Sequence, residues 1–234
     1  MVGKRMAFSL ARALRLLPHG VDLASDLSRH FPDRRFDLIF DVGANVGQTV
    51  LEFRSAFPKA SVISFEPDPD SFLTLKANVN GEQNLAVYNF GFSDRPGRLR
   101  FDNTSPISEI HAVAKNQGDQ HLPVIEFTTI DLFCSEQKIE RISLLKIDTE
   151  GHDLNVIRGA SHMLMQGRID VVLTECSLTQ ISKRLVSFSA MQTEMRDRGY
   201  VCFGIYKQAF SSEPHDPQIN WANCAFVPRS LARH

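Results

Sequence analysis

The first half of the chain alternates short apolar runs with stretches whose apolar residues recur at helical spacing. The apolar runs at residues 36–42, 61–65 and 85–90 predict three buried strands. The stretches between them predict helices over residues 46–57 and 71–79. Strands and helices that alternate at this spacing are typical of parallel βαβ units. The pattern therefore predicts an α/β fold.

The second half continues the alternation and adds two core strands. Residues 142–147 and 171–174 form the apolar runs, and residues 153–165 between them have the spacing of a helix. A further helix is predicted over residues 189–198, where Gly199 is placed to end it. These elements extend the parallel sheet beyond the first three strands.

The C-terminal part predicts a hairpin at one edge of this sheet. Residues 200–206 and 221–227 are strand-like, and the polar, proline-containing residues 211–218 join them. With the five earlier strands, the hairpin gives a mostly parallel, seven-stranded sheet that has an antiparallel edge and helices on both faces.

The middle of the chain departs from the alternation. Residues 98–101 predict a short strand, and residues 103–122 are polar with few periodic apolar positions. Long irregular segments inside a compact domain are often functional, so we expect residues 103–122 to form a substrate loop. Regular structure resumes at residues 124–129, after which Thr129 or Asp131 is placed to cap a short helix.

Composition narrows the class of protein. The chain has 234 residues, of which 43% are hydrophobic and 23% are charged, and this suits one α/β domain. The net charge of −1 argues against a general nucleic-acid binder, which usually carries a basic face. The cysteines match no metal-binding spacing, so we expect reduced thiols in a cytoplasmic protein. They are Cys134, Cys176, Cys202 and Cys224.

The first 35 residues differ from the rest in charge, with seven Lys or Arg against three Asp or Glu. Residues 2–17 predict a basic amphipathic helix whose apolar run is interrupted by Arg12 and Arg15, so no membrane span is expected. We divide the chain into a basic helical arm, residues 1–35, and a main domain, residues 36–234. The arm is either a lid or homodimer element, or a solvated helix packed on the sheet edge.

The turn after the first strand is the main candidate for a ligand site. Gly43 and Gly47 permit backbone conformations that a β-carbon would block, and Asn45 tolerates the left-handed region. The dinucleotide fingerprint G-x-G-x-x-G needs two more glycines, where the chain has Asn45 and Gln48. The charge of Asp41 is unfavourable beside a pyrophosphate but favourable beside a cationic ligand with an amino group, such as S-adenosylmethionine. The alternative is a tight turn that binds nothing.

Acidic residues follow other strands at the same edge of the sheet, where ligands of open parallel sheets bind. Glu66 follows Gly43 by 23 residues, close to the spacing at which an acid accepts hydrogen bonds from ribose hydroxyls. Phe92, Ser93 and Asp94 form a turn over the adenine in this geometry, where Asp94 accepts from the exocyclic amine and Phe92 contacts the ring. The alternatives are that Glu66 is a solvated acid at a turn and that residues 92–94 belong to an ordinary turn.

The segment after the fourth core strand is the second candidate site. Lys146 and Asp148 are two residues apart on one strand and so share a face, where they pair or face a ligand. Glu150 and His152 follow on a turn that Gly151 tightens. A histidine that titrates near neutrality is a natural general base for a hydroxyl nucleophile, although His152 can also simply begin a helix.

With these residues described, the chain resembles the FkbM-type methyltransferases, a family of S-adenosylmethionine-dependent O-methyltransferases. The resemblance covers about residues 36–175, and Asp153 stands where the family more often has Glu. The matching segments are residues 40–47, 65–67, 129–131, 146–152 and 156–160, together with Glu175.

The resemblance implies a single-domain, Rossmann-like class I methyltransferase fold and an acceptor hydroxyl on a sugar or secondary metabolite. The residues assigned to the cofactor are Asp41, Gly43, Ala44, Asn45, Gly47, Glu66, Phe92, Ser93 and Asp94. The residues assigned to the acceptor side are His152 as the preferred base, Asp148, Glu150, and Lys146 as the orienting residue. Asp148 with Glu175 is an alternative site for a divalent cation, but two carboxylates are a thin ligand set, so metal dependence is not favoured.

Two other functions remain open at this point. A nicotinamide-dependent oxidoreductase is disfavoured by the missing glycines. A non-catalytic cofactor-binding module predicts cofactor binding without methyl transfer. Methylation of nucleic-acid amines is disfavoured because no Asn/Asp-Pro-Pro-aromatic segment follows the fourth strand, so the expected partner is a small hydroxylated molecule and not a nucleic acid.

Overall fold

The structure is a computed structural model that describes residues 17–100, 123–179, 185–211 and 217–232. The predicted substrate loop, residues 103–122, lies outside the described residues, and so does the predicted N-terminal helix apart from its last residue.

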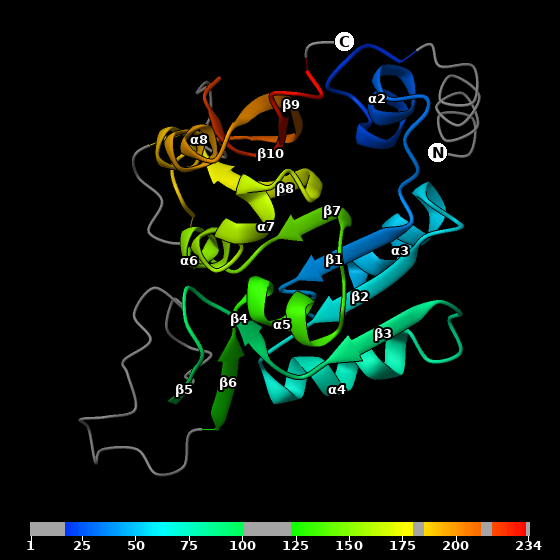
Figure 1. The fold of residues 1–234 in the computed structure, drawn as a ribbon, viewed down its shortest axis with the longest axis vertical. Helices are drawn as coiled ribbons and strands as arrows, with labels where there is room; N and C mark the ends of the chain where they lie inside the picture. The colour runs from blue at the N-terminus through cyan, green and yellow to red at the C-terminus, as the bar shows by residue number, and fades with distance from the viewer. Residues whose placement is uncertain (1–16, 101–122, 180–184, 212–216, 233–234) are drawn as a thin grey trace.

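The centre of the molecule is a seven-stranded sheet with the strand order β3-β2-β1-β7-β8-β10-β9 (Figure 1). Its strands are β1 (Leu38–Val42), β2 (Ser61–Phe65), β3 (Leu85–Tyr88), β7 (Ile142–Ile147), β8 (Ile169–Ser177), β9 (Tyr200–Phe210) and β10 (Ile219–Pro228). β10 pairs antiparallel with β8 and β9, and every other pair is parallel. The predicted mostly parallel sheet with an antiparallel hairpin at one edge is therefore confirmed.

Helices cover both faces of this sheet, as predicted. The helices α5 (Ile130–Glu136), α6 (Asp153–Arg158), α7 (Ser161–Met165) and α8 (Phe188–Asp197) contribute to the larger core cluster, on one face. The helices α2 (Leu23–His30), α3 (Gln48–Ala56) and α4 (Pro69–Asn78) contribute to the clusters on the other face. Alternate residues of β1 and β7 point to the two faces, so both central strands are buried on both sides.

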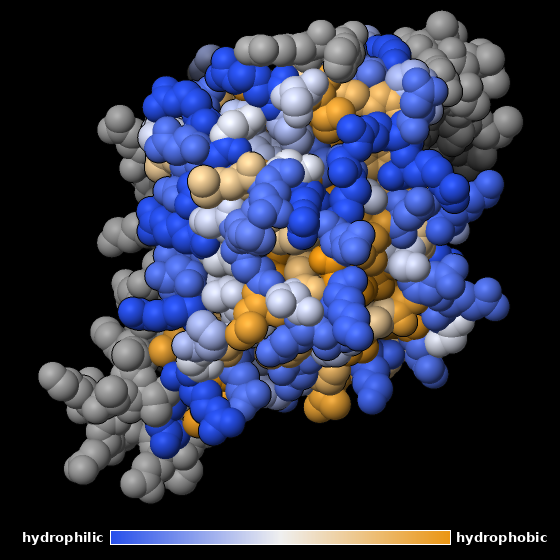
Figure 2. Space-filling model, in the orientation of Figure 1, coloured by the Kyte–Doolittle hydropathy of each residue, from blue (hydrophilic) through white to orange (hydrophobic). Residues whose placement is uncertain are grey.

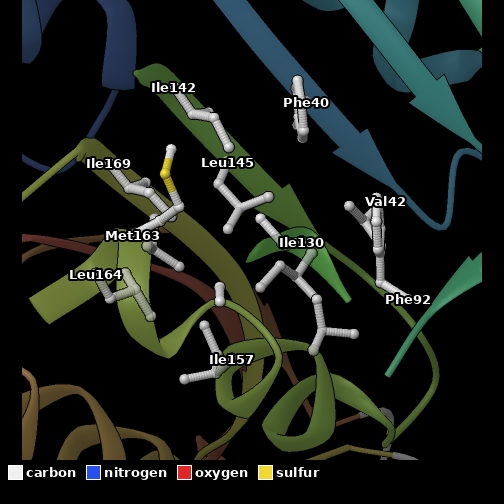
Figure 3. Close-up of a cluster of buried hydrophobic side chains, with 14 of the residues drawn as sticks. Phe40, Val42, Phe92, Ile130, Ile142, Leu145, Ile157, Met163, Leu164 and Ile169 are labelled. Carbon is white, nitrogen blue, oxygen red and sulfur yellow. The ribbon is translucent and has the colours of Figure 1, made fainter. Parts of the chain in front are cut away.

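The larger cluster is shown in Figure 3, where Phe40 and Val42 of β1 lie in the same cluster as Leu145 of β7 and Ile130 of α5. Phe40 and Leu145 are fully buried. Burial of one such side chain contributes about 1.5 to 3 kcal/mol, so this cluster stabilises the two strands whose ends form the candidate site.

A second, three-stranded sheet was not predicted as such. It has the order β4-β6-β5 and consists of β4 (Gly91–Phe92), β5 (Gly97–Arg100) and β6 (Val124–Thr128). It begins soon after β3, because the backbone turns at residues 89 and 90 and enters β4. This sheet holds the turn that contains Ser93 and Asp94 beside the carboxyl end of the main sheet, since Ser93 N donates to Thr128 O at 2.9 Å.

The single helix predicted over residues 153–165 is two helices, α6 and α7, separated at Gly159 and Ala160. A β-carbon at position 159 would lie 2.0 Å from the carbonyl oxygen of Ser93. Glycine therefore lets the end of α6 approach the turn after β4, and its low helix propensity favours the break.

Helix α2 lies within the predicted arm and was missed. Asp22 caps its N-terminus, and Leu27 is fully buried against the main sheet. The buried carboxylate of Asp26 accepts hydrogen bonds from Gly20 N at 2.7 Å and from the hydroxyl of Tyr206 on β9 at 3.0 Å. Ser25, Asp26 and Leu27 of α2 are therefore buried in the domain, within the residues that the sequence division placed in the arm.

The surface and the cysteines complete the description. Figure 2 shows one face of the molecule, which is covered mainly by hydrophilic residues with hydrophobic residues visible between them. None of the helices that the structure describes is long and apolar enough to cross a membrane. All four cysteines are free thiols, and three of them are buried.

Candidate active site

The candidate site lies at the carboxyl ends of the central strands. β1 pairs with β2 on one side and with β7 on the other, so the strand order reverses between β1 and β7. Ligands of open α/β sheets bind beyond this point. The ends of these strands and of their neighbour β8, with the segments that follow them, carry most of the residues predicted for the site.

The Gly/Asn turn after β1 has the predicted left-handed conformations, with φ of +76° at Gly43, +48° at Asn45 and +92° at Gly47. Gly43 N and Ala44 N donate to the carbonyl oxygen of Phe65 at 3.0 and 3.1 Å, which fixes the turn to the end of β2. A β-carbon at position 43 would lie 1.9 Å from the carbonyl oxygen of Asp148. Only glycine therefore permits the turn after β1 to pack against the turn after β7.

Glu66 is tied to the same turn by its side chain and is only 7% exposed. One carboxylate oxygen accepts from Asn45 N at 2.7 Å and the other from Asp68 N at 2.9 Å. Burial raises the pKa of Glu66, although these two hydrogen bonds oppose the shift. Each carboxylate oxygen has a second lone pair, so Glu66 retains the capacity to accept from ligand hydroxyls.

Asp41, which was predicted to lie beside the cofactor, is 0% exposed and is held by a basic side chain of the protein. Lys146 Nζ lies 3.3 Å from Asp41 Oδ1 and 3.3 Å from Asp148 Oδ2, so the lysine bridges the two carboxylates. Burial raises the pKa of Asp41 against the opposing attraction of Lys146. Burial alone would lower the pKa of Lys146, but the charges of Asp41 and Asp148 outweigh it and raise that pKa. The predicted pairing of Lys146 with Asp148 is confirmed, and Asp41 joins it.

Several buried polar atoms at this edge have no hydrogen-bond partner among the described residues. They are both carboxylate oxygens of Asp41, of which Oδ1 still has the ion pair with Lys146, together with Ser64 Oγ and Thr149 Oγ1. Asp41 and Ser64 are register partners in the parallel pair of β1 and β2, and Thr149 follows β7. Buried polar groups normally bind protein, water or a ligand. These orphaned atoms, next to a cradle that only glycine permits, fit the polar part of a bound cofactor.

The segment after β7 forms the other wall of the site. Glu150 and Gly151 have φ of +52° and +98°, and the side chain of Asp148 is 37% exposed. A left-handed backbone at a non-glycine residue such as Glu150 is uncommon and is enriched at functional sites. Gly151 tightens the turn as predicted.

Glu175 lies on β8, one position after the last residue of β8 that pairs with β7, and it is half-buried. Burial, together with the charges of Asp148, Glu150 and Asp153, raises the pKa of Glu175 to about 7. Asp153 itself is buried and accepts from Thr174 Oγ1 at 3.1 Å, which ties α6 to β8. Negative charge therefore accumulates at the carboxyl edge of β7 and β8. Among the described residues, Lys146 is the positively charged side chain that forms ion pairs there, with Asp41 and Asp148.

His152 lies between this wall and the turn after β4. Its Nε2 is 3.0 Å from Ser93 Oγ, and its Nδ1 is 3.1 Å from Asn155 Nδ2. Burial lowers the pKa of His152 against the opposing charge of Asp94. Both ring nitrogens therefore have protein partners, and neither is left for the acceptor hydroxyl that the base hypothesis requires.

Phe92 and Asp94, predicted to contact the adenine, differ in their surroundings. Phe92 is 1% exposed and packs against Phe65 with ring centroids 4.6 Å apart, so its ring belongs to the core and offers no face to adenine. The prediction failed because a single aromatic residue in a turn does not reveal which way its ring points. Asp94 is exposed, and Ser93 Oγ donates to its Oδ1 at 3.1 Å.

The alternative cation site at Asp148 and Glu175 gains no third ligand. No group of three or more His, Cys, Asp or Glu side chains within the described ranges is arranged to hold a metal ion. The two carboxylates thus remain a thin ligand set for a hard cation, which takes six or more oxygen ligands.

Two residues that contact the site were missed. Asn155 contacts His152 from three positions further along α6, a spacing that places two side chains on the same helix face and was available in the sequence. Asn89 donates to the carbonyl oxygens of Glu66 and Pro67 at 2.8 and 3.1 Å. No sequence signal marks Asn89, because its partners are more than 20 residues away.

The fold and these strand ends define a Rossmann-like structure of the class found in S-adenosylmethionine-dependent methyltransferases. The methyltransferase domain of METTL16 has a similar fold, with a TM-score of 0.50 and 12% identity. The match covers 88% of this chain and 64% of that one.

The family model described as Methyltransferase FkbM domain matches residues 41–202. This match covers more than half of the chain, so the chain belongs to the FkbM methyltransferase family. The matched segment begins at Asp41 in β1 and includes the Gly/Asn turn, the segment after β7 and Glu175.

Three curated relatives are 26% to 28% identical to this chain. The 2-O-methyltransferase NoeI of Sinorhizobium fredii is 28% identical over 155 residues, which are 60% of this chain and 63% of that protein. The hexuronic acid methyltransferase AglP of Haloferax volcanii is 27% identical over 175 residues, 70% of this chain and 69% of that protein. Methyltransferase 1 of Beauveria bassiana is 26% identical over 150 residues, 55% of this chain and 59% of that protein. The chain thus matches less than two thirds of the Beauveria and Sinorhizobium proteins.

The close approach at Gly43 predicts a large effect of a single methyl group. In Gly43→Ala the β-carbon meets the Asp148 carbonyl, so the turn must move, and we expect a loss of more than about 4 kcal/mol in unfolding free energy. Gly81→Ala is the matched control, because its φ is +87° but nothing lies within 4 Å of an added β-carbon. The control should lose only about 1 to 2 kcal/mol from backbone strain. Urea unfolding measures both, and equal losses would contradict the packing role.

The raised pKa of Glu175 predicts a pH-dependent stability. Between pH 4.5, its ordinary pKa, and about 7, the unfolded chain releases the proton that the folded chain keeps. Ionisation of Glu175 therefore destabilises the folded state. This destabilisation is absent below pH 4.5, grows between pH 4.5 and about 7, and is complete above pH 7. Glu175→Gln should raise the melting temperature relative to the parent at pH 8, and this gain should vanish at pH 4. A gain in melting temperature that does not change with pH would contradict the raised pKa of Glu175.

Proposed function

We propose that the chain is an S-adenosylmethionine-dependent O-methyltransferase that methylates a hydroxyl group of a sugar or a related secondary metabolite. The observation that carries the proposal is the arrangement at the carboxyl edge, where the Gly/Asn turn, bound by Glu66, meets a cluster of carboxylates in the segment after β7 and near the end of β8. Membership of the FkbM family supports the methyl donor. The names of NoeI and AglP, which specify a 2-O position and a hexuronic acid, support a sugar hydroxyl as acceptor.

The residues that would hold the cofactor surround the Gly/Asn turn. Gly43, Ala44, Asn45 and Gly47 form the backbone cradle, and Glu66 offers its free lone pairs to the ribose hydroxyls. When bound, S-adenosylmethionine supplies an electrophilic methyl group on a positively charged sulfur. The concentration of acidic groups at this edge favours a positively charged ligand over a pyrophosphate.

The acceptor side is the wall formed by the segment after β7 and the carboxyl end of β8. The acceptor hydroxyl must lose one proton, and a carboxylate at this wall receives it in our proposal. Asp148 and Glu150 are available, and Glu175 has the pKa, about 7, that suits a proton acceptor at neutral pH. Lys146 keeps Asp148 in place through their ion pair. Placement of the hydroxyl oxygen in line with the methyl group is the other task of the protein.

A binding measurement and a transfer assay test this function. Calorimetric titration should show binding of S-adenosylhomocysteine and no binding of NADH. A screen of glycosides, uronic acids and other hydroxylated acceptors with radiolabelled S-adenosylmethionine should then yield a labelled ether product. Each acceptor is tested with and without a chelator, and equal rates are expected because the described part of the chain adds no third ligand to the carboxylate pair.

The other outcomes assign the other functions. Binding of NADH alone would replace the proposal with an oxidoreductase. Binding of S-adenosylhomocysteine without transfer to any hydroxyl in the screen would favour a non-catalytic cofactor-binding module. A rate that falls with the chelator would show that the reaction requires a metal ion, for which Asp148 and Glu175 are the candidate ligands.

A further inference from the structure

His152 physically connects the two turns that flank the candidate site. Its Nε2 lies 3.0 Å from Ser93 Oγ in the turn after β4, and its Nδ1 lies 3.1 Å from Asn155 Nδ2 on α6. The ring also packs near Phe127 of β6, with centroids 5.9 Å apart. The imidazole is thus held on three sides by the protein.

Asn155 determines the direction of these hydrogen bonds. An amide NH₂ group can only donate, so Nδ1 of His152 accepts and carries no proton. In the neutral ring the proton is then on Nε2, which donates to Ser93 Oγ. The Ser93 hydroxyl in turn donates to Asp94 Oδ1 at 3.1 Å. The chain of hydrogen bonds therefore runs in one direction, from Asn155 through His152 and Ser93 to Asp94.

The backbone at Ser93 is fixed independently of this chain. Ser93 N donates to Thr128 O at 2.9 Å, and the Ser93 carbonyl oxygen packs closely against Gly159. The side chain of Asp94, by contrast, is exposed. The part of this turn that the hydrogen-bond chain orients is therefore the carboxylate of Asp94.

We propose that Asn155 and His152 orient Asp94 for the adenine end of the cofactor, and that His152 is a positioning residue and not the general base. The inference rests on the proposed function, because that function supplies the adenine. Ser93 occupies Oδ1 of Asp94, which leaves Oδ2 to accept a hydrogen bond from the exocyclic amine. The burial that lowers the pKa of His152 supports the neutral ring that this chain requires.

The first experiment measures cofactor affinity without catalysis. The dissociation constant of S-adenosylhomocysteine is determined by calorimetry for the parent, His152→Ala and His162→Ala. Loss of the hydrogen bond that holds Ser93 should weaken binding roughly tenfold in His152→Ala. His162 is exposed on α7 and serves as the control, with unchanged affinity. Unchanged affinity in His152→Ala would overturn the proposal.

His152→Gln separates a positioning role from a base role. The glutamine amide can donate to Ser93 Oγ but cannot take a proton from an acceptor hydroxyl. Positioning predicts that His152→Gln regains most of the affinity lost in His152→Ala and keeps methyl transfer to an acceptor found in the screen. Near-parental affinity with abolished transfer would show instead that His152 is the base.

Ser93→Ala tests the same chain without altering the imidazole, which matters if His152→Ala folds poorly. Ser93→Ala should weaken S-adenosylhomocysteine binding to the same extent as His152→Ala. The double variant that combines Ser93→Ala and His152→Ala should lose no more affinity than either single variant. Additive losses would contradict a shared chain.

The ring nitrogens give a spectroscopic test. NMR spectra of the ¹⁵N-histidine-labelled parent and of His152→Gln are compared, and the signals that the variant lacks are assigned to His152. In the parent, these signals should show a protonated Nε2 and an unprotonated Nδ1. A protonated Nδ1 would contradict the direction of the chain. If the parent itself does not bind S-adenosylhomocysteine, the proposed function fails and this inference fails with it, whereas equal binding by parent and His152→Ala overturns only the inference.

Discussion

The ion pair between Asp41 and Lys146 is the interaction on which the candidate site depends. It joins the two strands between which the sheet order reverses, and both side chains are almost completely buried. A buried carboxylate without a positive partner is strongly destabilising, so the pair holds the ends of β1 and β7 in register. The same contact sets the neighbouring geometry, because Asp148 N donates to Val42 O at 3.0 Å and Gly43 packs on the Asp148 carbonyl.

The charge at this edge connects the fold to the proposed chemistry. Lys146 compensates Asp41 and Asp148 together, while Glu150, Asp153 and Glu175 add further negative charge nearby. Burial and this accumulated negative charge together raise the pKa of Glu175. A site with such a field binds a cation favourably and accepts a proton from a hydroxyl near neutral pH. One electrostatic arrangement thus serves both the donor and the acceptor in our proposal.

Most of the main sheet could be predicted because its strands are contiguous apolar runs. The bounds of β2 and β7 agree with the prediction residue for residue. The small sheet could not be predicted in the same way, because β4 has two residues and pairs with β6 more than 30 positions away. Helix α2 was missed because it has only eight residues, although Leu23 and Leu27 have helical spacing and Asp22 is a recognisable capping residue.

In the candidate site too, contacts between residues near in sequence could be predicted, whereas contacts between distant segments could not. Local relations were accessible, such as the left-handed Asn45 or the pairing of Lys146 with Asp148 two positions away. The partner of Asp41 depends on the register of β1 against β7, and the partners of His152 depend on where the turn after β4 lies. Such contacts join distant segments, and periodicity carries no information about them. For this reason the sequence did not reveal that Lys146 neutralises Asp41, or that Ser93 and Asn155 contact the ring of His152.

A double-mutant cycle on Asp41 and Lys146 tests the central claim most directly. The unfolding free energies of Lys146→Met, Asp41→Asn and the double variant are measured by urea denaturation at neutral pH. If the pair holds the site together, Lys146→Met alone should lose about 3 to 5 kcal/mol by leaving a buried charge. The double variant should then be more stable than the sum of the two losses predicts, by at least about 1 kcal/mol. Losses that add to within about 0.5 kcal/mol would contradict the claim that this ion pair organises the carboxyl edge.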